Sequence, residues 1–298
     1  MKIPESLAYG FERHFQTGIS RESSLSYCQW LAKSHYENFT VVSWFLPREK
    51  RQHFYNIYSY CRWSDDLADE TGNPSLSMEL LDWWEGELDK CYQGKPEHPV
   101  FIALQETIHT FDIPSDPFRN LLKAFRQDQL MTRYPTFHEL LGYCENSANP
   151  VGHLVLYLSG YRDAQRQQLS DYTCTALQLT NFWQDIAIDL KKDRIYLPLE
   201  DLERFGYSQE DLYSHTFNEA FRELLKFEVD RTRELFDKGL PLCEKLDGSV
   251  RRDIELFTRG GLEMLNQIES VGYDIFNRRP ALSKSKKIQL MLSRLLKI

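Results

Sequence analysis

Residues 55–70 read YNIYSYCRWSDDLADE, and they combine the pattern of a buried helix with a dense cluster of acidic side chains. Apolar residues such as Ile57 and Leu67 recur at helical spacing, which indicates a helix that packs into a core. Four acids fall within two turns of this helix, where like charges repel: Asp65, Asp66, Asp69 and Glu70. We therefore expect a positive charge close to them.

The same spacing of apolar residues continues through most of the chain. Leu76, Leu80, Trp84 and Leu88 form one such run, and alternating strand patterns are scarce. Proline and glycine divide the helices, and no Ser/Gly-rich linker or internal repeat marks a domain boundary. The sequence predicts an all-α protein, a single domain of about ten helices over residues 1–298. The aromatic share of 13% suits a helical bundle with an apolar central cavity.

Charge and cysteine usage exclude several classes of protein. The formal charge of −8 argues against nucleic acid as a partner, because binding to phosphates needs a basic surface. Six widely spaced cysteines form no CxxC pair and the N-terminus lacks a signal-peptide pattern, so we expect reduced thiols in a cytoplasmic protein. No segment approaches the roughly 20 continuous apolar residues that a membrane-spanning helix needs.

The C-terminal residues 278–298 carry seven basic side chains and no acid. Ile288, Leu292 and Leu295 recur there at helical spacing. Two interpretations stay open: a helix on the membrane surface, which would give peripheral contact with the inner membrane face, and a closing helix that packs on the core.

Two helices each present carboxylates on one face. In the first, Arg62, Asp65 and Asp69 share a face through steps of three and four residues. In the second, QLTNFWQDIAIDLKKDRIYLP over residues 178–198, the polar residues of one face are Gln178, Asn181, Asp185 and Asp189.

Such pairs of carboxylates need a cation if they are buried. A like-charged pair about 4 Å apart costs on the order of 4 kcal/mol at an effective dielectric of roughly 20. Mg²⁺ takes carboxylate oxygens as ligands and shares the phosphates of a substrate. A single DxxxD pair is more often a solvated face, but two pairs together favour a metal. We expect the two helices to face one another and to hold Mg²⁺ beside an anionic leaving group.

These motifs resemble the squalene and phytoene synthases, the head-to-head isoprenoid synthases. The resemblance lies in residues 58–69, in the run from Gln178 to Gly206 and in HYENF at 35–39, which follow the family's order and span nearly the whole chain. Residues 98–114 and 142–161 are most similar to the hydroxysqualene synthases of the bacterial hopanoid pathway, the HpnC type. The resemblance implies an isoprenoid-synthase helical fold.

The resemblance also implies roles for individual residues. The family binds Mg²⁺ at the positions of Asp65, Asp69, Asn181, Asp185 and Asp189. It contacts the diphosphate at the positions of His35, Tyr58, Arg62, Gln178 and Arg194. The four aspartates are then the catalytic residues, as ionised metal ligands and not as general acids. For His35, a buried core histidine is an equal alternative.

One position departs from the family pattern. Squalene and phytoene synthases often have an arginine directly before the first aspartate of the second motif, whereas this chain has Gln184. One potential diphosphate ligand is thereby lost, which fits a substrate with a single diphosphate. The implied reaction converts presqualene diphosphate, made from two farnesyl diphosphates by a sister enzyme, and water to hydroxysqualene and diphosphate.

Three alternatives stay open at this point. Presqualene diphosphate, squalene or phytoene synthases condense two prenyl diphosphates, and a full squalene synthase would also need NADPH, for which no GxGxxG follows a strand. A non-catalytic helical scaffold has no reason to keep clustered charges in its interior. A lipid carrier with an aromatic cavity would bind its ligand without Mg²⁺.

Overall fold

The structure is a computed structural model that describes residues 14–15, 18–34 and 47–281. Its secondary structure is helical, and the described residues contain no strand beyond an isolated parallel bridge between Arg133 and Ile195. The all-α prediction is confirmed. The described residues form two compact units, one from residues up to 130 and from 150–163, the other from 131–149 and from 164 onward. The single domain expected from the sequence stays a prediction.

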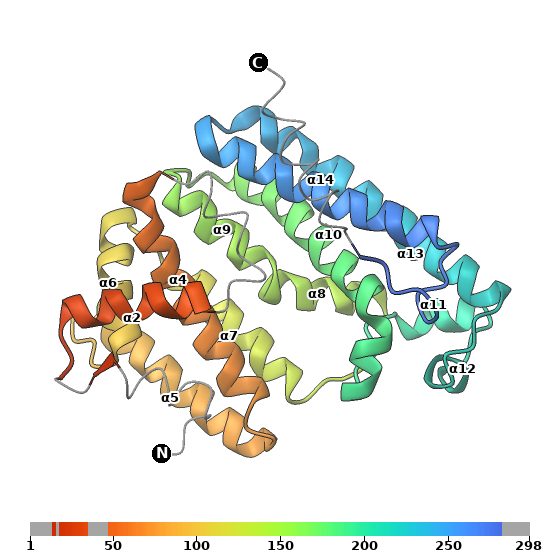
Figure 1. The fold of residues 1–298 in the computed structure, drawn as a ribbon, viewed down its shortest axis with the longest axis horizontal. Helices are drawn as coiled ribbons and strands as arrows, with labels where there is room; N and C mark the ends of the chain where they lie inside the picture. The colour runs from red at the N-terminus through yellow and green to blue at the C-terminus, as the bar shows by residue number, and fades with distance from the viewer. Residues whose placement is uncertain (1–13, 16–17, 35–46, 282–298) are drawn as a thin grey trace. The chain divides into compact units, whose positions relative to one another are not determined.

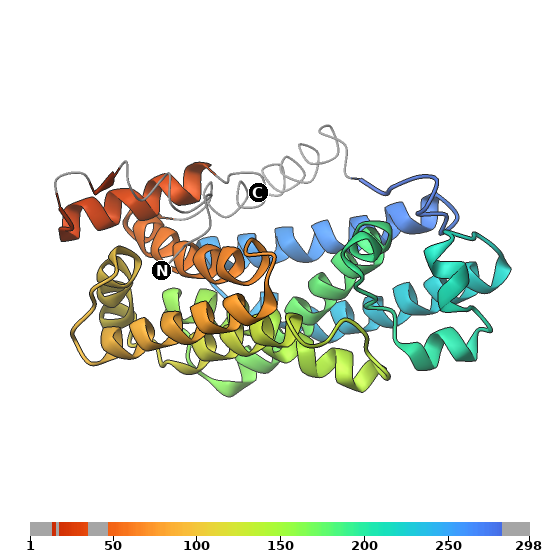
Figure 2. The ribbon, with the colours of Figure 1, turned by 90° about the horizontal axis from the view of Figure 1, so that it is seen from below.

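Helix α4 is the centre of the first unit. This unit contains α2 (Arg21–Ser34), α4 (Arg48–Asp69), α5 (Pro74–Tyr92), α6 (Pro99–Phe111), α7 (Asp116–Asp128) and most of α9 (Asn149–Leu158). Helix α4 packs against α2, α5, α6 and α7, as Figure 2 shows for its contact with α2. Local sequence sets the start of α5, because the Asn73 side chain accepts hydrogen bonds from two backbone N–H groups and Pro74 follows.

Aromatic residues fix the orientation of α4 in this core. Trp63 of α4 and Trp84 of α5 are fully buried and stack with ring centroids 5.2 Å apart. The indole N–H of Trp63 donates to the Tyr27 hydroxyl at 2.9 Å, and that of Trp84 donates to Ser64 Oγ at 3.0 Å. Both indole donors are thus satisfied, as burial of a tryptophan requires.

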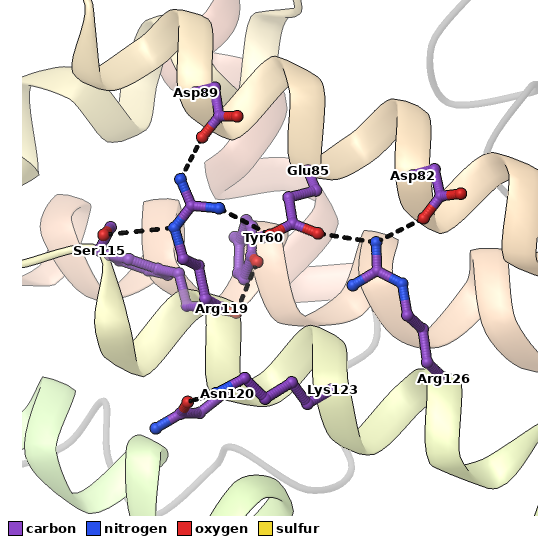
Figure 3. A network of polar contacts seen from close by, with 10 residues as sticks. Tyr60, Asp82, Glu85, Asp89, Ser115, Arg119, Asn120, Lys123 and Arg126 are labelled. Carbon is purple, nitrogen blue, oxygen red and sulfur yellow. Dashed lines mark hydrogen bonds and ion pairs between the residues drawn. The ribbon is translucent and has the colours of Figure 1, made fainter.

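A network of ion pairs joins α5 to α7 (Figure 3). Arg119 donates to Glu85 at 2.6 Å and to Asp89, while Arg126 donates to Asp82 and Glu85, each at 2.8 Å. These side chains are partly exposed, so each pair contributes about 1 kcal/mol or less. Asp82, Glu85 and Asp89 thus have counter-charges from the protein, and this network is no candidate for a metal site.

The second unit is built on the long helix α10. Its helices are α8 (Phe137–Ser147), α10 (Ala164–Asp189), η1 (Leu190–Lys192), α11 (Leu199–Arg204), α12 (Gln209–Tyr213), α13 (Glu219–Gly239), η2 (Leu240–Lys245) and α14 (Gly248–Ser270). Helices α13 and α14 lie against α10 (Figure 1). Gly261 of α14 permits this approach, since a Cβ there would collide with the Phe236 ring and with Leu177. Trp183 of α10 is buried and donates to Thr232 Oγ1 of α13 at 2.8 Å.

Two further predictions from the sequence concern membrane-spanning helices and the state of the cysteines. Within the described ranges no helix combines the length and hydropathy needed to cross a membrane. All six cysteines have free thiols. Residues 282–298, which form most of the basic C-terminal segment, lie outside the described residues.

Candidate active site

Burial distinguishes the acids of α4 from one another. Asp66 is buried and accepts two hydrogen bonds from Arg62, from Nε to Oδ2 at 3.1 Å and from Nη2 to Oδ1. The Asp65 side chain is 48% exposed, with Oδ2 3.7 Å from Arg62 Nη1. A buried carboxylate without a partner would be strongly destabilising, and Arg62 offsets that cost. For Asp66 the positive charge expected from the sequence is therefore a side chain of the same helix.

The predicted site face of α4 is partly open to solvent. Asp65 and Asp69, one turn apart, are both partly exposed, and so are Arg62 and Tyr58. Burial raises the pKa of Tyr58, although the nearby Arg62 opposes this shift, so its phenol stays a proton donor at neutral pH. The structure thus keeps these four residues on one helix, and their roles stay predictions. His35 lies outside the described residues.

The second motif occupies the end of α10. Asn181 is exposed, whereas Gln178, Asp185 and Asp189 are partly buried. Burial and then the charge of Asp185 raise the pKa of Asp189 to about 7, and Arg194 opposes that shift only in part. Ionising both carboxylates is therefore unfavourable unless a cation binds beside them.

The chemistry of these residues fits Mg²⁺. A divalent cation relieves the repulsion between two carboxylates on adjacent turns, and Mg²⁺ commonly binds through one or two carboxylates, waters and substrate phosphates. Over the described ranges, no three or more His, Cys, Asp or Glu side chains are gathered so that they could hold a metal. The α4 aspartates belong to the first unit and the α10 aspartates to the second. A shared metal site therefore stays a prediction.

Arg133 and Tyr213, which sequence reasoning missed, hold the turn after α10. Asp193 adopts a left-handed conformation with φ of 56°, next to the predicted site residue Arg194. Arg133 donates to Asp193 Oδ1 at 2.6 Å and to its backbone oxygen, and the Tyr213 hydroxyl donates to the same carboxylate. These contacts join positions far apart in the chain, so helical periodicity gave no signal for them. They fix the backbone from which Arg194 projects.

A small pocket brings Asp189 and Arg194 together. Its walls include Phe182, Tyr196 and Leu212. The rings of Phe182 and Tyr196 stack with centroids 3.7 Å apart and an interplanar angle of 7°. One carboxylate and one guanidinium thus line the same pocket as an aromatic surface. Sequence reasoning missed Tyr196, although its position inside the RIYLP segment was an available signal.

A contact between α10 and the chain after α14 was also missed. Gln184 Nε2 donates to the backbone oxygen of Pro280 at 3.0 Å. Next to it, Arg279 Nη2 lies 2.9 Å from Asp185 Oδ1. The sequence placed Arg279 in the basic C-terminal segment, but its guanidinium pairs with a predicted metal ligand.

Comparison with known proteins identifies the family. The model of the squalene/phytoene synthase family matches residues 32–286. The chain belongs to this family. Among its relatives, the 15-cis-phytoene synthase of Synechocystis sp. is 32% identical over 281 residues, which cover 90% of this chain and 83% of the relative. The phytoene synthase of Arthrospira platensis is 31% identical over 289 residues, which cover 93% and 94%.

Solved structures of other proteins agree with this assignment. The squalene synthase HpnC from Alicyclobacillus acidocaldarius is 43% identical with a TM-score of 0.82, covering 85% of this chain and 95% of that one. A dehydrosqualene synthase in complex with a ligand is 26% identical, also with a TM-score of 0.82, covering 92% and 95%. The isoprenoid-synthase fold expected from the motifs is confirmed. As a member of this squalene/phytoene synthase family, the protein is an enzyme that acts on isoprenoid diphosphates.

Proposed function

We propose that this protein is an Mg²⁺-dependent hydroxysqualene synthase, a carbon–oxygen lyase that converts presqualene diphosphate and water to hydroxysqualene and diphosphate. The main observation behind it is the Asp185–Asp189 pair. The pKa of Asp189 is raised to about 7, which indicates that a bound cation would stabilise the two ionised carboxylates. The choice of reaction within the family is supported by 43% identity to the HpnC squalene synthase, against 32% to a phytoene synthase.

Each group has a role that agrees with its chemistry. The residues that would hold Mg²⁺ are Asp65, Asp69, Asn181, Asp185 and Asp189. The residues that would bind the diphosphate are His35, Tyr58, Arg62, Gln178 and Arg194. Bound Mg²⁺ would supply positive charge at the oxygen of the leaving group. Among the diphosphate-binding residues, Arg194 has the most direct support, because it lines the same pocket as Asp189.

The bond changes explain the need for an apolar surface beside these charges. The carbon–oxygen bond to the diphosphate breaks, and its electron pair leaves with the diphosphate. The resulting carbocation rearranges and then bonds to the oxygen of water, which loses a proton to the departing diphosphate. The buried rings of Phe182 and Tyr196 form an apolar wall beside Asp189 and Arg194, which would help to exclude water before that moment.

A condensing enzyme is the second candidate, and the phytoene synthases among the relatives favour it. Such an enzyme would join two prenyl diphosphates, and a complete squalene synthase would also use NADPH. The purified protein should therefore be incubated with Mg²⁺ and presqualene diphosphate, farnesyl diphosphate or geranylgeranyl diphosphate, with and without NADPH. Hydroxysqualene from presqualene diphosphate alone would support the proposal. Turnover of farnesyl diphosphate without a partner enzyme would contradict it.

A non-catalytic scaffold or lipid carrier is tested with the same assay. Asp185→Ala should abolish turnover while circular dichroism shows an intact helical fold, and a chelator should stop the wild-type reaction. Unchanged product formation in the variant, or in the presence of the chelator, would contradict the assigned metal site.

The basic C-terminal segment supports a further proposal on location. We propose a cytoplasmic protein in which the basic residues after position 281 make peripheral contact with anionic lipid at the inner membrane face, close to the sister enzymes that supply the substrate. Cosedimentation with phosphatidylglycerol vesicles, but not with phosphatidylcholine vesicles, is the expected result. Equal sedimentation of a chain truncated after residue 281 would contradict the contact.

A further inference from the structure

Ser147, the last residue of α8, carries a hydroxyl that its surroundings leave unsatisfied. Its Oγ atom is shielded from solvent and has no hydrogen-bond partner among the described residues. By contrast, the Ser159 hydroxyl at the end of α9 donates to the backbone oxygen of Val155 at 2.8 Å. A buried hydroxyl that is left unpaired is unfavourable, and a bound water is a common way to satisfy it. Ser147 therefore has both a donor and an acceptor to offer to a small polar ligand.

The place of Ser147 on α8 is close to the aromatic wall of the candidate site. Ser147 lies one turn after Tyr143, on the buried face of α8. The centroid of the Tyr143 ring is 6.1 Å from that of Phe182 and 5.9 Å from that of Tyr196. These two rings line the pocket of the second aspartate motif. Ser147 is thus roughly 6 Å further along α8 than the residue whose ring contacts this wall.

A buried polar contact fixes the chain directly after Ser147. Asn149 and Thr175 are both buried, and Thr175 Oγ1 donates to Asn149 Oδ1 at 3.0 Å. Thr175 is on α10, seven residues or two turns before Phe182, and so it lies on the same side of that helix. The contact therefore ties the end of α8 to the face of α10 that carries the aromatic wall.

We propose that Ser147 binds and orients the water that captures the carbocation, and that Asn149 and Thr175 are positioning residues for it. This inference rests on the proposed function, since only a reaction that ends with water needs an ordered water beside an apolar wall. Ser147 Oγ accepts a hydrogen bond from this water, which directs a lone pair of the water oxygen to the cation.

The bond changes leave Ser147 itself unaltered. The carbon–oxygen bond of hydroxysqualene forms from the lone pair of the water, and the proton that the water loses goes to the departing diphosphate. Without an ordered water, the cation loses a proton from carbon and becomes a hydrocarbon. Ser147 thus determines the product and not the rate at which diphosphate departs.

The test measures two quantities for the full chain with presqualene diphosphate and Mg²⁺: the release of diphosphate and the fraction of product that is hydroxysqualene. In Ser147→Ala, the release of diphosphate should stay close to the wild-type rate, because ionisation precedes capture. The hydroxysqualene fraction should fall about tenfold, the effect of losing one hydrogen bond, and hydrocarbons should replace it. Ser147→Thr, which keeps a hydroxyl, should restore most of the hydroxysqualene.

The matched control is Ser159→Ala, which also removes a partly buried hydroxyl at the end of a helix. Because the helix itself satisfies that hydroxyl, the products should be those of the wild type. Circular dichroism and thermal melting show whether each variant is folded. Ser147→Cys, which has a weakly bonding thiol of similar size, provides the same test if the alanine variant folds poorly.

Thr175→Val tests the positioning role, because it removes the donor to Asn149. It should lower the hydroxysqualene fraction about threefold in the wild type and have no further effect in Ser147→Ala, since both changes act on one water. Additive effects of the two substitutions would overturn the positioning role.

The outcomes separate this inference from the proposed function. The wild-type product mixture in folded Ser147→Ala, an equal loss of hydroxysqualene in Ser159→Ala, or a release of diphosphate that falls as far as hydroxysqualene does would each overturn the role of Ser147. If the wild type forms no hydroxysqualene from presqualene diphosphate, the proposed function is wrong and this inference fails with it.

Discussion

Asp189→Asn is expected to make the metal-free protein more stable and the enzyme inactive. Burial and Asp185 raise the pKa of Asp189 from 3.8 to about 7. At 1.36 kcal/mol for each pKa unit, the ionised carboxylate costs the folded state up to about 4 kcal/mol. Because Asp189 is partly exposed, solvent screening reduces this figure, and we expect about 2 kcal/mol.

The direction of the pKa shift fixes how this gain depends on pH. Below about pH 4 the carboxyl is protonated in both the folded and the unfolded chain, so the wild type and Asp189→Asn should be equally stable. Between about pH 4 and about pH 7 the carboxyl ionises in the unfolded chain but stays protonated in the folded wild type, so the wild type loses stability over this range, whereas the variant does not. The difference in unfolding free energy should therefore be near zero at about pH 4 and reach about 2 kcal/mol at about pH 8.

Urea unfolding in the presence of a chelator, followed by circular dichroism at both pH values, measures this difference. Asp237→Asn on α13 is the matched control, because Asp237 is exposed and the same atoms change. Mg²⁺ should stabilise the wild type more than Asp189→Asn. Turnover of this variant should fall by about 100-fold or more, because loss of a residue that only orients a metal ligand already costs about 10- to 100-fold. A variant less stable than the wild type at about pH 8, or a gain that does not change with pH, would refute the reasoning.

Three further predictions concern the framework of the second unit. Glu228 is buried, and burial raises its pKa to about 8, so the free energy of unfolding falls as the pH rises toward 8. Glu228→Gln should flatten this pH dependence in urea titrations, and an unchanged dependence of the unfolding free energy on pH would contradict the prediction. Gly261→Leu forces a side chain against Phe236 and should lower the unfolding free energy by about 3 kcal/mol, visible as a lower Tm; an unaltered Tm would show that the helices can separate without cost. Arg133→Met loosens the turn that carries Arg194 and should raise KM about tenfold with little change in kcat, and an unchanged KM would refute this positioning role.

Local sequence rules were sufficient for the fold class, because the signals act within a few residues. The spacing of Leu80, Trp84 and Leu88 alone predicts a helix with a buried face, and all three are buried. Asn73 followed by Pro74 likewise marks the start of α5. Such rules are informative wherever the contact that matters is a few positions away.

The burial of individual acids needed the tertiary structure. Asp65 and Asp66 are neighbours in the sequence, yet only Asp66 is buried. Its pairing with Arg62, four residues earlier, could have been predicted from helical spacing. The contacts of Arg133 with Asp193 and of Arg279 with Asp185 could not, since they join residues 60 and 94 positions apart. No periodicity connects such positions, and only the packed helices bring them together.

The contact at Gln184 changes what this residue implies about the substrate. From the sequence, Gln184 in place of an arginine indicates one diphosphate ligand fewer, and so a substrate with one diphosphate. In the structure, Gln184 holds the segment that brings Arg279 to Asp185. A guanidinium thus lies beside Asp185 even though position 184 holds no arginine, and Gln184 by itself no longer argues for a single diphosphate. The choice between hydroxysqualene synthesis and condensation then depends on the likeness to the HpnC squalene synthase and on the products formed from presqualene diphosphate.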